Sequence, residues 1–433
     1  MKSYIKFILL LLFLLPELQL IAQVPMPAPG QLRPTYIVGA TAHLGNGKVI
    51  ENSVIAFEEG KLTIVSSPED LPKVNLSRYR IIEARGQHIY PGFIGTDTQL
   101  GLVEIGQVRA SRDDVEVGQM NPSVRSLIAY NTDSEVTPTV RSQGVLLAQI
   151  CPEGGRITGQ SSVVQLDAWN WEDAAVKVDE GIHLDWPSLY SFSWRQRSFS
   201  KNDNYDDQVQ EVHDYFKEAR AYAQKQTHEV TNLKFEAMRG LFDKSKKLYV
   251  HTNTAATISQ AVVFGEEYGV SVIIVGGRDA WMVSSLLKEK KVPVILRQTH
   301  NLPASADSDI DQPFKTPAQL QEDGVLFSLS GGGSWTLRNL AFQAGQAVSF
   351  GLEYENAVSA LTLNPAKILG IDDRVGSLEV GKEATLFISE GDALDMRTSK
   401  VTHAFISGRD INLENKQKVL YEKFKAKYER QGK

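Results

Sequence analysis

Residues 90–105 constrain this chain more than any other segment, because they predict a buried strand that ends in polar side chains. The segment begins YPGFIGTDTQ: a Pro-Gly turn, an apolar pair and then a polar cluster, before a second apolar patch. In barrels built of alternating strands and helices, the chemistry sits where strands end. Asp97 and Gln99 are therefore candidate site residues.

Short apolar, β-branched runs recur downstream of this segment and are bounded by polar residues or glycine. Amphipathic helical patterns separate several of them, at residues 257–268 and 280–290. Strands that alternate with helices indicate a parallel sheet, and their number favours a (β/α)8 TIM barrel over an open sheet. The predicted strands are residues 145–150, 161–166, 248–252, 270–275, 292–296 and 325–329.

The two ends of the chain carry a different pattern, with short alternating strands and turns before and after the barrel. Asn364-Pro365 predicts the start of a helix that ends at Gly370. The predicted organisation is a segment 1–22 that is removed, the first half of a β-sandwich over 31–90, the barrel over 91–370 with an insertion at about 182–237, the second half of the β-sandwich over 371–412 and a charged C-terminal helix over 413–433.

The motifs at both ends of the predicted barrel resemble those of the amidohydrolase superfamily, including its imidazolonepropionase-like and secreted members. The resemblance rests on YPGFI at residues 90–94 and on NPAKILG at 364–370, followed by VGSL and GK. It implies an α/β fold, a TIM barrel with a flanking composite β-sandwich formed by N- and C-terminal segments. It also implies metal-dependent C–N hydrolysis with zinc, and an oligomer.

The resemblance can be checked ligand by ligand, and most of the metal ligands are missing. The His-x-His pair of the first strand is replaced by Asp97 and Gln99, while His251 stands at the end of a predicted strand, as in the family. The family's sixth-strand histidine and eighth-strand aspartate are absent. Glycine and arginine stand there instead, which makes Gln99, Gly276, Gly277, Arg278, Gly331 and Gly332 candidate pocket-lining residues.

Zinc needs at least three protein ligands, and Asp97 with His251 supplies two. We therefore expect no catalytic residues of the usual kind, no cofactor, and a pseudoenzyme that binds a small molecule or peptide. Such a protein could also form a homo- or hetero-oligomer with an active relative. The alternative is an active amidohydrolase with an atypical zinc site around Asp97 and His251. His183 has no spaced partner in the sequence and receives no role.

The first residues of the chain indicate export. Lys2 and Lys6 precede an apolar run that is too short to span a bilayer, and a small residue follows at Ala22, so residues 1–22 predict a signal peptide and a periplasmic or secreted protein. The single cysteine, Cys151, follows an apolar run and is expected to be buried and inert. A net charge of -6 without a long basic run argues against nucleic-acid binding.

Overall fold

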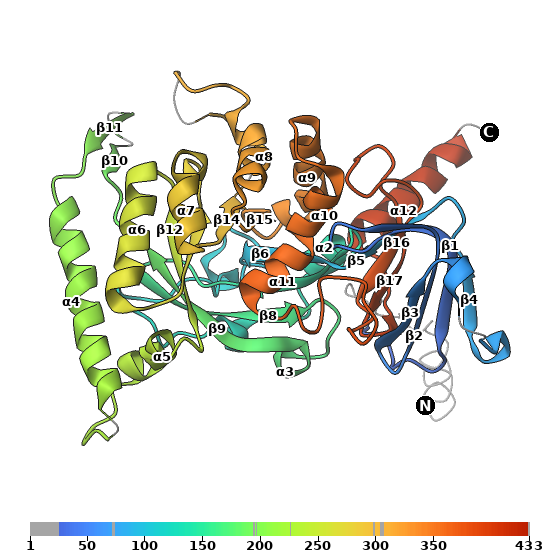
Figure 1. Cartoon of the computed structure of the whole chain (residues 1–433), viewed down its shortest axis with the longest axis horizontal. Helices are drawn as coiled ribbons and strands as arrows, with labels where there is room; N and C mark the ends of the chain where they lie inside the picture. Colours follow the sequence, from blue (N-terminus) through green and yellow to red (C-terminus); the bar gives the residue numbers. More distant parts are fainter. Residues whose placement is uncertain are drawn as a thin grey trace, which may run out of the picture.

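The computed structural model describes residues 26–71, 74–193, 195, 197–225, 227–297, 299–303 and 307–431. The predicted signal peptide lies outside the described residues. Figure 1 shows the barrel beside a sheet in which the blue N-terminal strands lie next to red C-terminal strands. No helix among the described residues is long and apolar enough to cross a membrane.

The flanking sheet combines strands from both ends of the chain. The N-terminal strands are β1 (Thr35–His43), β2 (Val49–Glu58), β3 (Lys61–Ser66), β4 (Arg80–Glu83) and β5 (His88–Pro91), and the C-terminal strands are β16 (Leu386–Ser389), β17 (Val401–Ile406) and β18 (Arg409–Asp410). Their order is β18-β17-β16-β5-β1-β2-β3, and β4 pairs with β1. Hydrogen bonds thus join N- and C-terminal segments in one sheet through the pair β5–β16.

Eight further strands form a nearly closed barrel in the order β15-β14-β13-β12-β9-β8-β7-β6. They are β6 (Phe93–Thr98), β7 (Val145–Ile150), β8 (Ile157–Gln165), β9 (Ala175–Asp185), β12 (Lys247–Thr252), β13 (Val272–Gly276), β14 (Val294–Arg297) and β15 (Phe327–Ser330). The seam between β15 and β6 is bridged by the Ser330 hydroxyl, which donates to the Thr96 carbonyl at 2.8 Å. The predicted α/β fold class is confirmed.

Helices follow the second half of the barrel. They are α6 (Ala255–Tyr268), α7 (Ser284–Lys290), α8 (Gln312–Asp323), α9 (Leu340–Ser349), α10 (Tyr354–Leu361) and α11 (Leu363–Leu369). Figure 1 shows α6 to α10 along one side of the barrel. Ile368 and Leu369 of α11 share a buried cluster with barrel residues such as Ile273 and Ile295. Helix α11 therefore packs against the barrel strands through this apolar cluster.

The remaining elements are shorter or peripheral. They are α2 (Val136–Arg141), α3 (Trp171–Ala174), the hairpin β10 (Tyr190–Ser193) and β11 (Ser198–Lys201), α4 (Tyr205–Gln224), α5 (Leu233–Phe242) and α12 (Lys416–Gln431). Single 3-10 turns occupy Pro68–Asp70, Leu76–Arg78, Arg109–Ser111, Ser126–Ala129, Ala280–Val283 and Thr336–Asn339.

The structure corrects three details of the sequence analysis. The insertion does not begin at residue 182, because residues 182–185 belong to β9 and pair with β12. The barrel is not wholly parallel: β8 runs antiparallel to both β7 and β9. The helix predicted to start with Asn364 as its N-cap begins one residue earlier, at Leu363, and the Asn364 amide donates to the Phe327 carbonyl; the helix ends at Gly370 as predicted, and Gly370 is in the left-handed conformation.

Candidate functional site

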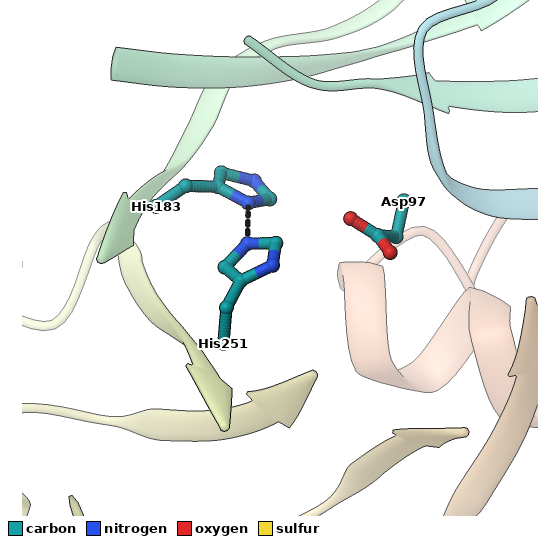
Figure 2. A group of neighbouring side chains, drawn as sticks. All are labelled: Asp97, His183 and His251. Carbon is teal, nitrogen blue, oxygen red and sulfur yellow. Dashed lines mark hydrogen bonds between the residues drawn. The ribbon is translucent and has the colours of Figure 1, made fainter. Parts of the chain in front are cut away.

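Four side chains converge at the carboxyl ends of barrel strands. Asp97 lies near the end of β6, His183 near the end of β9, His251 in β12 and Arg297 at the end of β14. Figure 2 shows the carboxylate of Asp97 facing the two imidazole rings. Ligand atoms of Asp97, His183 and His251 all lie within 4.8 Å of one another.

The two histidines form a direct pair. His183 Nδ1 lies 2.8 Å from His251 Nε2, the bond drawn dashed in Figure 2. The His183 ring also stacks on Tyr249, with centroids 4.7 Å apart. Burial lowers the pKa of His183 well below its ordinary value, and burial also lowers the pKa of His251. Both rings are therefore neutral at pH 7.

Arg297 forms a two-pronged ion pair with Asp97. Arg297 Nη2 donates to Asp97 Oδ1 at 2.9 Å, and Arg297 Nε donates to Asp97 Oδ2. The Asp97 side chain is fully buried, while that of Arg297 is 37% exposed. Burial would raise the pKa of Asp97, but the charge and hydrogen bonds of Arg297 lower it to about 2. The carboxylate is therefore ionised at pH 7.

Arg297 also fixes the protons of the histidine pair. Its Nη2 lies 3.1 Å from His251 Nδ1, and because a guanidinium can only donate, this ring nitrogen must accept. The proton of neutral His251 then sits on Nε2 and is donated to His183 Nδ1. His183 keeps its own proton on Nε2, which is buried and has no hydrogen-bond partner among the described residues.

A second polar layer lies beneath the site, around the fully buried Glu180. Its carboxylate accepts hydrogen bonds from Tyr249 Oη at 2.7 Å, Ser161 Oγ at 2.6 Å and Gln149 Nε2 at 2.7 Å. Gln149 Oε1 in turn accepts from the backbone N–H of Asp97 at 3.1 Å. Burial raises the pKa of Glu180. This layer holds the backbone of Asp97, whose φ of 53° is in the left-handed region.

A cavity of about 570 Å³ opens beside Arg297 at the barrel mouth. Its size is within the usual range for small-molecule sites. Three of the predicted pocket residues line it, whereas Gln99, Gly277 and Gly331 are not in its wall. The wall is formed by Asn253, Gly276, Arg278, Leu296, Arg297, Thr299, Asn301, Leu302, Pro313, Thr316 and Gly332.

Leu337 fills the space at the ends of β6 and β15. A Cβ placed on Gly331 would lie 2.7 Å from Leu337 Cα, and one placed on Gly95 would lie 2.7 Å from Leu337 Cδ1. A side chain at Gly331 would therefore have to move the backbone of the 3-10 turn that carries Leu337, whereas one at Gly95 would displace only the Leu337 side chain.

The residues at this site do not fit the metal that the resemblance implies. Two nitrogens bound to one tetrahedral zinc would be roughly 3.3 Å apart, but the histidine nitrogens are at direct hydrogen-bonding distance. Arg297 occupies both oxygens of Asp97 and one nitrogen of His251. Within the part of the chain that the structure describes, His183 Nε2 is the one ring nitrogen of the pair without a hydrogen-bond partner. The guanidinium of Arg297 is thus hydrogen-bonded to atoms of Asp97 and His251 that would have to bind the metal.

Comparison with known proteins agrees with this fold. A model of the amidohydrolase family matches residues 197–411. An amidohydrolase from Thermotoga maritima MSB8 is 26% identical, with a TM-score of 0.75 over 87% of this chain and 99% of that chain. A molinate hydrolase shares the fold at 17% identity, with a TM-score of 0.56 over 89% of this chain and 96% of that chain. A Xaa-Pro dipeptidase shares it at 14% identity, with a TM-score of 0.54 over 87% of this chain and 99% of that chain. No curated protein sequence matches the chain.

The barrel, its flanking composite sheet and these matches define an amidohydrolase-like protein. The chain belongs to the amidohydrolase superfamily. The resemblance read from residues 90–94 and 364–370 is therefore confirmed at the level of the superfamily.

Two of the four convergent residues were predicted from the sequence. Asp97 and His251 lie together, as the resemblance implied, but His183 and Arg297 were missed. A signal existed for each of them. His183 stands in the alternating stretch Gly181-Ile182-His183-Leu184, and Arg297 directly follows the predicted strand 292–296.

Proposed function

We propose that this chain is a superfamily member that has lost metal-dependent C–N hydrolysis and that its barrel mouth binds a small molecule or peptide. The ion pair between Arg297 and Asp97 is the observation that carries the proposal. The ion pair places the positive charge of Arg297 among the side chains that would have to bind a metal for the family's reaction. Without a bound metal, nothing at this site lowers the pKa of an attacking water.

The cavity beside Arg297 supports a binding role. Its wall carries three apolar side chains, four amide or hydroxyl side chains and two arginines, and such polar groups can orient a bound small molecule. The N–H of His183, which has no hydrogen-bond partner among the described residues, adds a buried donor beside the Asp97–Arg297 pair. We propose in addition that the protein is exported after removal of residues 1–22, and that it acts by itself or as a subunit beside an active relative.

Metal analysis of the purified protein tests the loss of hydrolysis. We expect no stoichiometric transition metal in the wild type and no zinc binding by calorimetric titration. The variant Arg297→Gln frees Asp97 and His251, so it should bind zinc more tightly than the wild type. Arg278→Gln is the matched control, because Arg278 lies at the same mouth but pairs with its neighbour Asp279.

The second candidate function is an active amidohydrolase with an atypical metal site. It is favoured by the closeness of the ligand atoms of Asp97, His183 and His251, all within 4.8 Å. Stoichiometric metal in the wild type, lost together with hydrolysis of a Xaa-Pro dipeptide in Asp97→Ala or His251→Ala, would establish this candidate and refute the first.

Two further measurements address export and assembly. N-terminal sequencing of the protein from its native cell should give Gln23 as the first residue, and an intact Met1 would contradict export with cleavage. Cross-linking followed by mass spectrometry in the native envelope should capture an amidohydrolase relative. Recovery of this chain only with copies of itself would contradict the hetero-oligomer.

A further inference from the structure

Helix α12 (Lys416–Gln431) is exposed along its whole length. None of its residues is buried. Among the described residues, its side-chain hydrogen bonds to the barrel come from its first turn, where Lys416 donates to Glu135 at 2.6 Å and Gln417 accepts from Thr139 at 2.7 Å. Figure 1 shows α12 rising from the flanking sheet to the edge of the molecule.

The helix carries an exposed apolar stripe. Leu420, Phe424 and Tyr428 are spaced by four residues and therefore share one face, and Tyr421 borders them. Leu420 is 41% exposed, Phe424 is 46% exposed, and the two tyrosines are each 64% exposed. We call these four residues the α12 stripe. Four large apolar side chains on one face of a charged helix need an explanation beyond scattered surface hydrophobics.

Lysines border the α12 stripe on both sides. At 3.6 residues per turn, Lys423 and Lys427 flank it on one edge and Lys418 and Lys425 on the other, and Glu422 and Glu429 lie just beyond Lys418. The helix has six Lys and Arg against two Glu, a net charge of +4, in a chain whose net charge is -6. The positive charge of this acidic protein is thus concentrated around its exposed apolar face.

We propose that α12 is a membrane-surface helix that lays the α12 stripe onto an anionic phospholipid layer. Interfacial helices bury an apolar face to the depth of the headgroups while flanking lysines reach back to lipid phosphates. Tyrosine is well suited to this depth, because its ring is apolar and its hydroxyl is polar. The partner that matches the helix is therefore a lipid layer with apolar acyl chains and negatively charged headgroups.

Charge complementarity favours this occupant over a neutral surface. Each lysine near an anionic membrane strengthens binding roughly fivefold, and the attraction is screened by salt. Among the described residues, the side-chain hydrogen bonds of α12 to the body lie in its first turn, so the later turns, which carry Phe424 and Tyr428, are the part that would meet the lipid. Binding through α12 is therefore peripheral and reversible.

Co-sedimentation of the full chain with vesicles tests the proposal. We expect sedimentation with vesicles of mixed phosphatidylglycerol and phosphatidylcholine, little with pure phosphatidylcholine, and a loss of binding as ionic strength rises. The double variant Phe424→Ser/Tyr428→Ser should weaken binding at least tenfold. Removal of two flanking charges in Lys423→Gln/Lys427→Gln should weaken it roughly thirtyfold, at about fivefold per lysine.

Matched controls separate the helix from general surface effects. Val230→Ser/Val380→Ser removes two exposed apolar side chains elsewhere, and Lys48→Gln/Lys201→Gln removes two exposed lysines elsewhere. Both should bind vesicles like the wild type. Because no residue of α12 is buried, the α12 variants should keep the wild-type circular dichroism spectrum and melting curve.

Two outcomes would overturn the proposal. One is equal binding to anionic and neutral vesicles, or no binding to either. The other is lipid-free self-association, seen by sedimentation velocity and lost in Phe424→Ser/Tyr428→Ser, without vesicle binding. That result would assign the stripe to a second copy of the chain, whose α4 offers an acidic groove lined by Asp207, Glu211, Asp214 and Glu218.

Discussion

Asp97→Asn tests the central ion pair with little change in shape. Asparagine has nearly the size of aspartate and tolerates the left-handed backbone, so the φ of 53° at position 97 can be kept. The substitution removes the negative charge and leaves the guanidinium of Arg297 without its counter-ion. The effect on stability therefore reports the electrostatic part of the interaction.

The magnitude follows from the pKa of Asp97. Arg297 holds this pKa at about 2, against an ordinary value of 3.8. A folded-state pKa below the unfolded-state value stabilises the protein above the unfolded value and loses this contribution as the pH falls through the folded value. The stabilisation is about 2.5 kcal/mol at pH 7 and about 1.3 kcal/mol at pH 3. Arg297 is 37% exposed, so water limits the further cost of its unpaired charge.

Urea denaturation followed by tryptophan fluorescence measures the difference, because urea carries no charge and does not screen the pair. The free energy of unfolding of Asp97→Asn should lie below that of the wild type at pH 7, and the gap should narrow by about half at pH 3. A control is Asp395→Asn, whose partner Arg397 is 83% exposed, and it should not change stability measurably. A gap that is absent, or the same at both pH values, would refute the reasoning.

Three further predictions concern the packing around the site. Gly331→Ala should lower the free energy of unfolding by about 1–3 kcal/mol, since its Cβ would meet the Leu337 backbone, and thermal melting will show this. Tyr249→Phe removes one donor to buried Glu180 and should cost about 1–2 kcal/mol in urea denaturation. Cys151, whose thiol pKa is raised by burial, should resist a thiol reagent until the chain is unfolded, and rapid labelling of the native protein would contradict its burial.

The barrel could be predicted because its strands have strong local patterns. The runs at residues 145–150, 248–252 and 325–329 correspond to β7, β12 and β15, since β-branched residues between polar boundaries are typical of buried strands. The direction of β8 could not be predicted. Antiparallel pairing depends on which strand edges meet in space, and residues 157–165 have no feature that fixes this.

The candidate site was only half predictable for a similar reason. Asp97 and His251 were found because the family resemblance points to their positions. Arg297 is as close to Asp97 as any residue of the site, but it is 200 positions away in the sequence. The predicted strand 292–296 ends immediately before it, so the element was recognised while its terminal charge was overlooked. The two residues come together only when the barrel has formed, so their ion pair cannot be recognised from neighbouring positions in the sequence.

The composite sheet sets the order in which this chain can complete its fold. Strand β5 pairs with β1 on one side and with β16 on the other, and the whole barrel lies between β5 and β16 in the sequence. During synthesis, one edge of β5 stays open until residues 386–389 have left the ribosome. Unpaired edges attract other strands, and late pairing between distant segments is slow. A ribosome that stalls inside the barrel would therefore release a chain prone to aggregation.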